Sequence, residues 1–219
     1  MLTMDIWIIV TIVSLIFLLA AERKEDIAKR VVYKVIASTG FILTAVSGGA
    51  FESRYGVLIL IGLALSWFGD VFLLWRTSRT FQAGLVSFLL AHVAYITAFI
   101  FVFSTARSGD LTSWAIICPV LLVIPFIKRW LDPHLPAAMR YPVYAYIFVI
   151  SIMVMGAILA SLATGQWAIL IGAVMFYLSD VSVARDRFVA PGFINGLWGL
   201  PLYYGGQLFL AYSVSLIGR

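Results

Sequence analysis

The 219-residue sequence contains few charged residues. Only 11% of its residues are Asp, Glu, Lys or Arg, whereas 63% are hydrophobic, and the mean hydropathy is +1.05. A soluble domain needs a polar surface, and about a quarter of its residues are usually charged. The composition therefore excludes an ordinary soluble domain and predicts a protein that lies in a lipid bilayer.

Cysteine and histidine are also scarce. Cys118 is the one cysteine, which excludes a disulfide within the chain, and the two histidines form no cluster at metal-ligand spacing. We therefore expect no metal and no cofactor. Residues 1–5 lack the positive charge that begins a signal peptide, so the first apolar segment is interpreted as a helix of the protein.

Long apolar runs fill most of the chain. Eight of them approach the roughly 17 to 25 residues that span a bilayer. The predicted fold class is therefore all-α, a polytopic membrane bundle of eight transmembrane helices in a single domain, residues 1–219. The run with Pro119 and Pro125 gives the weakest signal. The eight runs are 4–21, 31–50, 55–75, 80–104, 112–128, 141–162, 166–184 and 195–217.

The basic residues fall mainly on one side of these eight runs. Of the fifteen Lys and Arg residues, Arg54, Arg107 and Arg219 lie on one side and the others lie on the opposite side. The positive-inside rule assigns the richer side to the cytoplasm, which places both termini outside. This topology and attraction to anionic lipid explain the net charge of +5, so no nucleic-acid partner is expected.

Two similar stretches each carry an aspartate within an apolar run. They read IGLALSWFGDV at 61–71 and IGAVMFYLSDV at 171–181. Their alignment matches Asp70 with Asp180, and the offset between the two stretches is half the chain length. The match predicts two four-helix halves, 1–109 and 110–219, related as a parallel pseudo-repeat.

Asp70 and Asp180 are predicted to share one depth in the membrane. Asp70 lies six residues before Arg76 and Asp180 five before Arg185, which places both very roughly 8 Å from the basic boundary. An aspartate in hydrocarbon costs at least ~2.5 kcal/mol and commonly has a function. The alternatives are a buried hydrogen bond to a neighbouring helix or an ion pair with Lys34.

A pair of carboxyl groups in a site of low dielectric constant supplies both an acid and a base. Because both cannot ionise easily, one tends to keep its proton while the other stays charged. Such a pair suits protonation of an ether or acetal with stabilisation of the oxocarbenium ion, or activation of water against an amide.

Other polar residues are candidates to line the same site. Lys34 either balances an aspartate or extends to a lipid phosphate. Ser66 and Ser179 adjoin the aspartates in sequence, although serine commonly bonds the carbonyl groups of its own helix.

Two further polar pairs are spaced three residues apart, so each pair shares a helix face. His92 pairs with Tyr95 and Tyr204 with Gln207, and both pairs are predicted to lie deeper than the aspartates. They either line the site or hydrogen-bond helices together.

These residues resemble the YhhN-like lysoplasmalogenase family of membrane hydrolases with eight spans. The resemblance covers residues 31–210 and departs from the family pattern where this chain reads VSVARDRF after its second aspartate. It rests on GDVFLL at 69–74, FQAGLVSFLLAHVAYITAF at 81–99, GAVMFYLSD at 172–180 and YYGGQLFL at 203–210.

The resemblance implies hydrolysis of the vinyl ether bond of lysoplasmalogens, releasing a fatty aldehyde and glycerophosphoethanolamine or glycerophosphocholine. One of Asp70 and Asp180 would be the acid and the other the carboxylate that stabilises the cation, with the assignment open. Basic residues near the boundary, among them Lys34, Arg76 and Arg185, would hold the phosphate. The expected location is the cytoplasmic membrane of a bacterium, with the site nearer the cytoplasmic side.

Three other classes of protein are alternatives. An intramembrane aspartyl protease would resemble Gly-x-Gly-Asp with a partner Tyr-Asp, but the chain reads Trp67-Phe68-Gly69-Asp70 and Leu178-Ser179-Asp180. A proton-coupled transporter is the stronger alternative, since paralogous halves and matched carboxylates suit alternating access. A structural or partner-binding membrane protein would need the aspartates only for folding.

Overall fold

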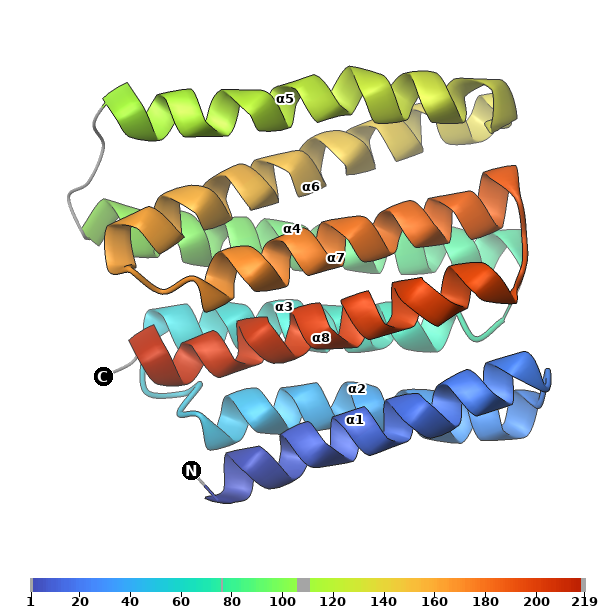
Figure 1. Cartoon of the computed structure of the whole chain (residues 1–219), viewed down its shortest axis with the longest axis horizontal. Helices are drawn as coiled ribbons and strands as arrows, with labels where there is room; N and C mark the ends of the chain where they lie inside the picture. The colour runs from blue at the N-terminus through green and yellow to red at the C-terminus, as the bar shows by residue number, and fades with distance from the viewer. Residues whose placement is uncertain (1, 76, 106–110, 218–219) are drawn as a thin grey trace.

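Figure 1 shows a computed structural model, which describes residues 2–75, 77–105 and 111–217. Within these residues the chain is helical, which confirms the all-α class. A single 3₁₀ turn, η1 (Asp132–His134), precedes α6, and a π-helical turn, η2 (Arg185–Val189), follows α7. The eight α-helices are α1 (Leu2–Arg23), α2 (Ile27–Ser47), α3 (Arg54–Phe72), α4 (Ser78–Thr105), α5 (Leu111–Leu131), α6 (Ala137–Thr164), α7 (Ala168–Ala184) and α8 (Phe193–Ile217).

Capping residues set several helix ends. The Asp26 side chain accepts a hydrogen bond from the backbone N–H of Lys29 at the start of α2, at 3.1 Å. Ser53 caps α3 in the same way through the N–H of Gly56, at 3.0 Å. At the end of α6, Gly165 adopts a left-handed conformation with φ of 73°. Polar caps and a terminal glycine satisfy backbone groups that the helix leaves unpaired.

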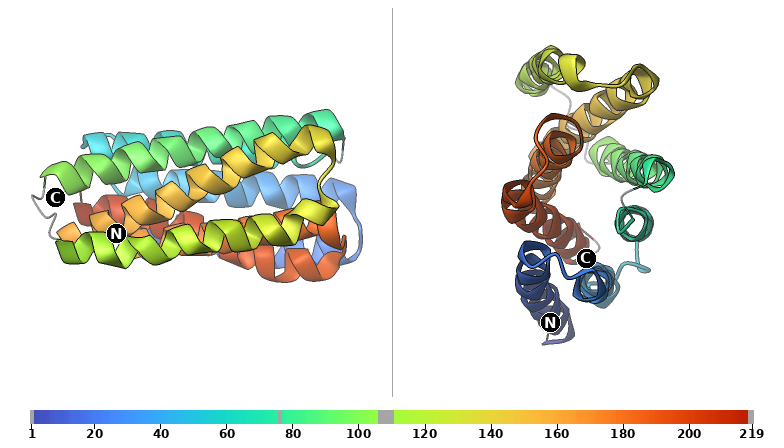
Figure 2. Two further views of the ribbon diagram at one scale, coloured as in Figure 1. Left: turned by 90° about the horizontal axis from the view of Figure 1, so that it is seen from above. Right: turned by 90° about the vertical axis from the view of Figure 1, so that its right-hand side faces the viewer.

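The helices lie side by side along one long axis, and both termini lie at the same end of the bundle (Figure 1). We call this the terminal end. The turns that follow α1, α3, α5 and α7 lie at the other end, which we call the basic end. α3 packs along α4 and α7 along α8, while α8 also contacts α1, α2 and α3. α5 lies at the edge against α6 (Figure 2).

Glycines allow the aspartate-bearing helices to approach their neighbours closely. A Cβ atom added at Gly62 of α3 would lie 2.2 Å from the Tyr95 ring of α4. A Cβ atom added at Gly172 of α7 would lie 2.9 Å from the carbonyl oxygen of Gly206 on α8. Small residues serve this purpose in membrane helix packing. Gly62 and Gly172 occupy matching positions in the two similar stretches.

The chain is a multi-pass membrane protein. In the part of the chain that the structure describes, six helices are long and apolar enough to cross a membrane, namely α1, α2, α3, α4, α6 and α7, the last together with η2. Large apolar side chains such as Ile9, Ile16 and Phe126 face outward, as lipid contact requires. α8 contains Asn195, Gln207 and several glycines, which lower its hydropathy. The count of eight spans stays a prediction.

Candidate active site

Asp70 lies buried near the end of α3, with 3% of its surface exposed. Its Oδ2 atom accepts hydrogen bonds from Ser38 Oγ at 2.6 Å and from Tyr203 Oη at 2.7 Å. Its Oδ1 atom lies 3.2 Å from Nζ of Lys34. The ion pair with Lys34 that was one alternative from the sequence is therefore confirmed. We call these four residues the Asp70 cluster.

Tyr204 lies beside the Asp70 cluster without contacting the carboxyl group. Its hydroxyl is 3.2 Å from Ser38 Oγ and donates to the backbone carbonyl of Lys34 at 3.4 Å. A narrow gap between α2 and α3, with no room for a water molecule, borders the cluster. Its lining residues are Lys34, Val35, Ser38, Trp67, Asp70, Val71 and Leu74.

Asp180 of α7 has a different set of partners. Its Oδ2 atom accepts a hydrogen bond from Tyr146 Oη of α6 at 2.7 Å and lies 3.3 Å from Nε2 of His92 on α4. His92 Nε2 and Tyr146 Oη are 2.9 Å apart, so the three polar atoms form a triangle. His92 is fully buried, whereas the Asp180 side chain is 16% exposed. We call these three residues the Asp180 cluster.

Packed aromatic rings connect the two clusters. Phe176 precedes Asp180 by four residues on α7, and its ring centroid is 5.4 Å from that of Tyr203 and 4.6 Å from that of His92. Phe88 of α4 packs against both Phe176 and Tyr203. Between these described carboxyl groups there is no direct hydrogen bond. Asp70 and Asp180 therefore lie in separate polar surroundings joined by an apolar layer.

The position of His92 corrects the prediction from the sequence. The sequence placed His92 deeper in the membrane than the aspartates, and this is wrong because its Nε2 atom contacts Asp180. A depth counted in residues along separate helices takes no account of helix tilt or of the reach of two side chains.

Tyr95, which shares a helix face with His92, links α4 to α8 through a hydrogen bond. Tyr95 Oη donates to Gln207 Oε1 at 2.8 Å, and both side chains are fully buried between α4 and α8. The alternative that these residues hydrogen-bond helices together is confirmed for this pair. Neither residue is a hydrogen-bond partner of Asp70 or Asp180.

The two serines adjoining the aspartates in sequence do not bond to them. Ser179 Oγ donates to the carbonyl oxygen of Phe176 at 2.7 Å, which confirms the alternative that it bonds its own helix. Ser66 is fully buried one turn before Asp70, and its carbonyl oxygen lies 3.5 Å from Tyr203 Oη.

Basic residues lie at the turn beyond Asp180. The Arg185 guanidinium donates to Oδ1 of Asn195, and Asn195 Nδ2 in turn donates to Asp186 Oδ1 at 3.0 Å. The Arg187 guanidinium lies 4.6 Å from the centre of the Phe81 ring. Arg76, also predicted to bind substrate, lies outside the described residues.

Four contact residues were missed by the sequence analysis. Ser38 and Tyr203 bond to Asp70, Tyr146 bonds to Asp180, and Met153 Sδ lies 3.2 Å from Nδ1 of His92. Tyr203 is adjacent to the predicted Tyr204, so the YYGG motif was the one available signal. Tyr146 and Met153 lie on α6, where no site residue was predicted.

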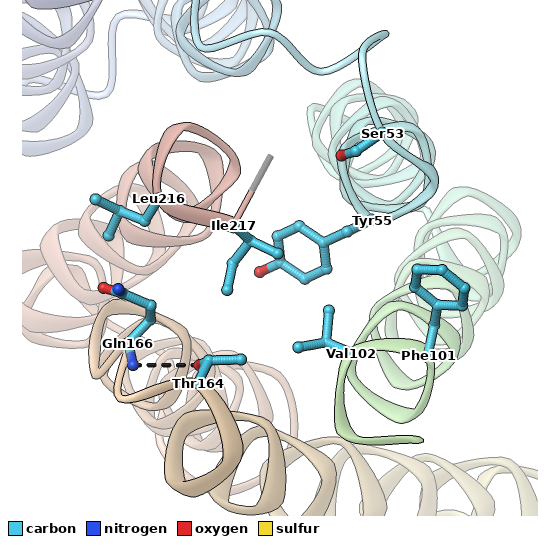
Figure 3. Close-up of a pocket in the computed structure, with 8 residues that line it drawn as sticks. All are labelled: Ser53, Tyr55, Phe101, Val102, Thr164, Gln166, Leu216 and Ile217. Carbon is cyan, nitrogen blue, oxygen red and sulfur yellow. Dashed lines mark hydrogen bonds between the residues drawn. The ribbon is translucent and has the colours of Figure 1, made fainter. Parts of the chain in front are cut away.

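A larger hollow lies at the terminal end of the bundle, among the ends of α3, α4, α6 and α8 (Figure 3). Its volume is about 330 Å³. Tyr55, which lines it, precedes Asp70 by fifteen residues on α3, or roughly 22 Å along the helix. The hollow is therefore remote from the Asp70 cluster. Its lining residues are Ser53, Tyr55, Phe101, Val102, Thr164, Gln166, Leu216 and Ile217.

Comparison with known proteins gives a consistent set of relatives. The model of the YhhN family matches residues 29–214, a range that contains both clusters. Lysoplasmalogenase TMEM86A of Bos taurus is 28% identical over 180 residues, covering 80% of this chain and 68% of the relative. Lysoplasmalogenase TMEM86B of Homo sapiens is 30% identical over 180 residues, covering 82% and 71% respectively. No solved structure matches the chain.

Proposed function

We propose, because this chain belongs to the YhhN family, that it is an integral membrane hydrolase that cleaves the vinyl ether bond of lysoplasmalogens. The products are a fatty aldehyde and glycerophosphoethanolamine or glycerophosphocholine. The names of the relatives, all lysoplasmalogenases, support this reaction.

Hydrolysis of a vinyl ether begins with transfer of a proton to carbon. The proton adds to the β-carbon of the double bond, and the α-carbon becomes part of an oxocarbenium ion. Water adds to this cation and loses a proton, giving a hemiacetal that collapses to the aldehyde and the glycerol alcohol. The enzyme therefore needs an acid that protonates carbon and a carboxylate that stabilises the cation.

The observation that carries the proposal is the difference between the surroundings of the two aspartates. Asp70 pairs with the Lys34 ammonium group, whereas Asp180 meets an imidazole ring and a phenol. Environments that differ in this way separate the protonation behaviour of two carboxyl groups. One residue type thus supplies both roles, and Asp70 and Asp180 are the proposed catalytic residues.

The site suits a lysolipid that enters from the membrane. With eight spans and both termini outside, the basic end faces the cytoplasm, and both aspartates lie just beneath the level of the lipid headgroups. Arg185 and Arg76 would hold the phosphate, since Lys34 is engaged by Asp70. The alkenyl chain would lie along the apolar helices. Ser66, Tyr95, Ser179, Tyr204 and Gln207 would keep the helices around the site in register.

The test is aldehyde release by the purified protein in detergent micelles. The substrates are lysoplasmenylethanolamine and lysoplasmenylcholine, and the variants are Asp70→Asn and Asp180→Asn. Asp132→Asn is the matched control, because Asp132 lies in the turn η1 and pairs with Lys128. We expect aldehyde from the wild type and the control only.

Absence of aldehyde from folded wild-type protein with both headgroups would contradict the proposal. Uptake of substrate into sealed vesicles without hydrolysis would instead support a proton-coupled transporter that uses the same two carboxyl groups.

A further inference from the structure

We propose that the Asp180 cluster stores the proton that is transferred to the substrate, with Asp180 as the acid and His92 and Tyr146 as positioning residues. This inference rests on the proposed function and assigns the role that the sequence leaves open between the two aspartates.

The tautomer of His92 follows from its contact with Met153. Nδ1 lies 3.2 Å from the thioether sulfur, which accepts hydrogen bonds weakly and cannot donate one. If Nδ1 carried no hydrogen, its lone pair would face a lone pair of the Met153 sulfur in a fully buried site. Nδ1 therefore carries a hydrogen, and in a neutral ring Nε2 is left as an acceptor.

The triangle of polar atoms then requires one proton more than a neutral imidazole, a phenol and a carboxylate contain. Tyr146 has a single hydroxyl hydrogen, which it donates to Asp180 Oδ2 at 2.7 Å. Nε2 of His92 faces that same Oδ2 at 3.3 Å and the Tyr146 oxygen at 2.9 Å. Three acceptors at these distances repel one another unless a further hydrogen lies between Nε2 and Oδ2.

That hydrogen lies either on Asp180 as a carboxylic acid or on His92 as an imidazolium ion beside a carboxylate. In both forms the pair holds one transferable proton. Asp180 is the partly exposed member, at 16%, while His92 is fully enclosed. Substrate therefore reaches the carboxyl group, and the ring behind it supplies and recovers the proton.

Asp70 does not fit the role of the acid. Burial of Asp70 disfavours its charged form. Against this, its carboxyl group receives two hydroxyl donors and the Lys34 ammonium group, and each of these donors favours the ionised carboxylate. The two aspartates therefore differ in protonation, with the proton on the Asp180 side of the aromatic layer.

The proposed cycle balances protons. Asp180 gives its proton to the β-carbon while the π electrons of the double bond form the new C–H bond, and the ether oxygen shares the charge on the α-carbon. Water then adds to the α-carbon, and the proton that it loses returns to the Asp180 carboxylate. His92 is the second group of the pair that can hold this proton. Asp180 thus acts first as an acid and then as a base.

Nitrogen NMR of His92 tests, without any substrate, the tautomer on which the stored proton rests. The chain has two histidines, and His134 lies exposed in η1, so a His134→Asn variant leaves His92 as the single labelled ring. We expect a protonated Nδ1, in either the neutral or the imidazolium form. A neutral ring with its hydrogen on Nε2 and a bare Nδ1 would overturn the proposal.

A matched pair of tyrosine variants tests the positioning role. Tyr146→Phe removes a donor to Asp180, whereas Tyr177→Phe removes a hydroxyl of α7 that lies 3.3 Å from Ser151 Oγ of α6. We expect Tyr146→Phe to lower kcat about 10- to 100-fold with KM within about twofold, and Tyr177→Phe to change neither beyond about twofold. Equal effects of the two variants, or an effect of Tyr146→Phe on KM alone, would overturn the positioning role.

The two failures are distinguishable. If folded wild-type protein releases no aldehyde, the proposed function fails, and the NMR measurement still decides whether Nδ1 of His92 carries the hydrogen from which the additional proton is inferred.

Discussion

Asp70 and Asp180 occupy matching sequence contexts, yet they differ in chemistry. Each aspartate lies eight residues after the glycine of an Ile-Gly pair, and a valine follows it directly. α3 turns Asp70 toward α2 and α8, where an ammonium group and two hydroxyls enclose it. α7 turns Asp180 toward α4 and α6, where an imidazole and a phenol meet it. The neighbouring helices therefore decide which polar groups meet each aspartate.

The largest expected effect is the loss of activity on Asp180→Asn. Asparagine fills the same space but cannot transfer a proton, so we expect kcat to fall about 10²- to 10⁴-fold. Because Asp180 has no lysine or arginine partner among the described residues, the unfolding temperature in detergent should change little. Aldehyde release and thermal unfolding measure the two effects, and near-normal turnover would show that Asp180 is not the acid.

Asp70→Asn is expected to reduce stability as well as activity. The substitution leaves the Lys34 ammonium group without its counter-charge in a buried site, and breaking such a pair costs about 3–5 kcal/mol. The double variant Lys34→Met with Asp70→Asn removes both charges and should regain most of that stability while staying inactive. Denaturant unfolding of both variants tests this, and a double variant no more stable than Asp70→Asn would argue against the charge explanation.

The sequence predicted the helices, and it predicted Lys34 as one possible partner of Asp70, but it predicted none of the other hydrogen-bond partners of the aspartates. Each of the eight apolar runs overlaps one observed helix, because bilayer thickness imposes a length that composition reveals. The Lys34 pair was among the alternatives since Lys34 and Asp70 share a level. Helix rotation and tilt decide which tyrosine bonds to each aspartate. They bring Tyr203 rather than Tyr204 to Asp70, and Tyr146 rather than Tyr141 or Tyr144 to Asp180. Rotation and tilt are set by side-chain packing between distant segments, which one sequence does not display.

Glycine substitutions test whether the two similar stretches also share a packing role. Gly62→Ala would push the Tyr95 ring, and Gly172→Ala would meet the backbone oxygen of Gly206. We expect both to destabilise the fold by about 1–3 kcal/mol. Gly156→Ala is the control, because its added Cβ would lie 3.5 Å from Phe99, an ordinary contact. If only one of the two substitutions lowers stability, the two similar stretches do not share this packing role.

The smallest expected effect concerns Asp132, an ion-paired carboxylate outside the helices. The Tyr144 hydroxyl and then the Lys128 ammonium group lower the pKa of Asp132 below its ordinary value of 3.8. This pair therefore adds stability above pH 3.8 that is lost as the pH falls through the lowered pKa. Unfolding temperatures of wild type and Asp132→Asn should differ slightly at pH 6 and converge in acid, whereas a constant gap would exclude this linkage.

Hydrolysis in heavy water tests the central claim most directly, namely that Asp180 and Asp70 support proton transfer to carbon. The aldehyde released from lysoplasmenylethanolamine would be reduced in place to the alcohol and examined by mass spectrometry. We predict one deuterium on the carbon next to the former aldehyde carbon, and product formation by Asp180→Asn that is at least about 10²-fold slower. Aldehyde that lacks this deuterium would contradict protonation of the β-carbon and the proposed role of the paired carboxyl groups.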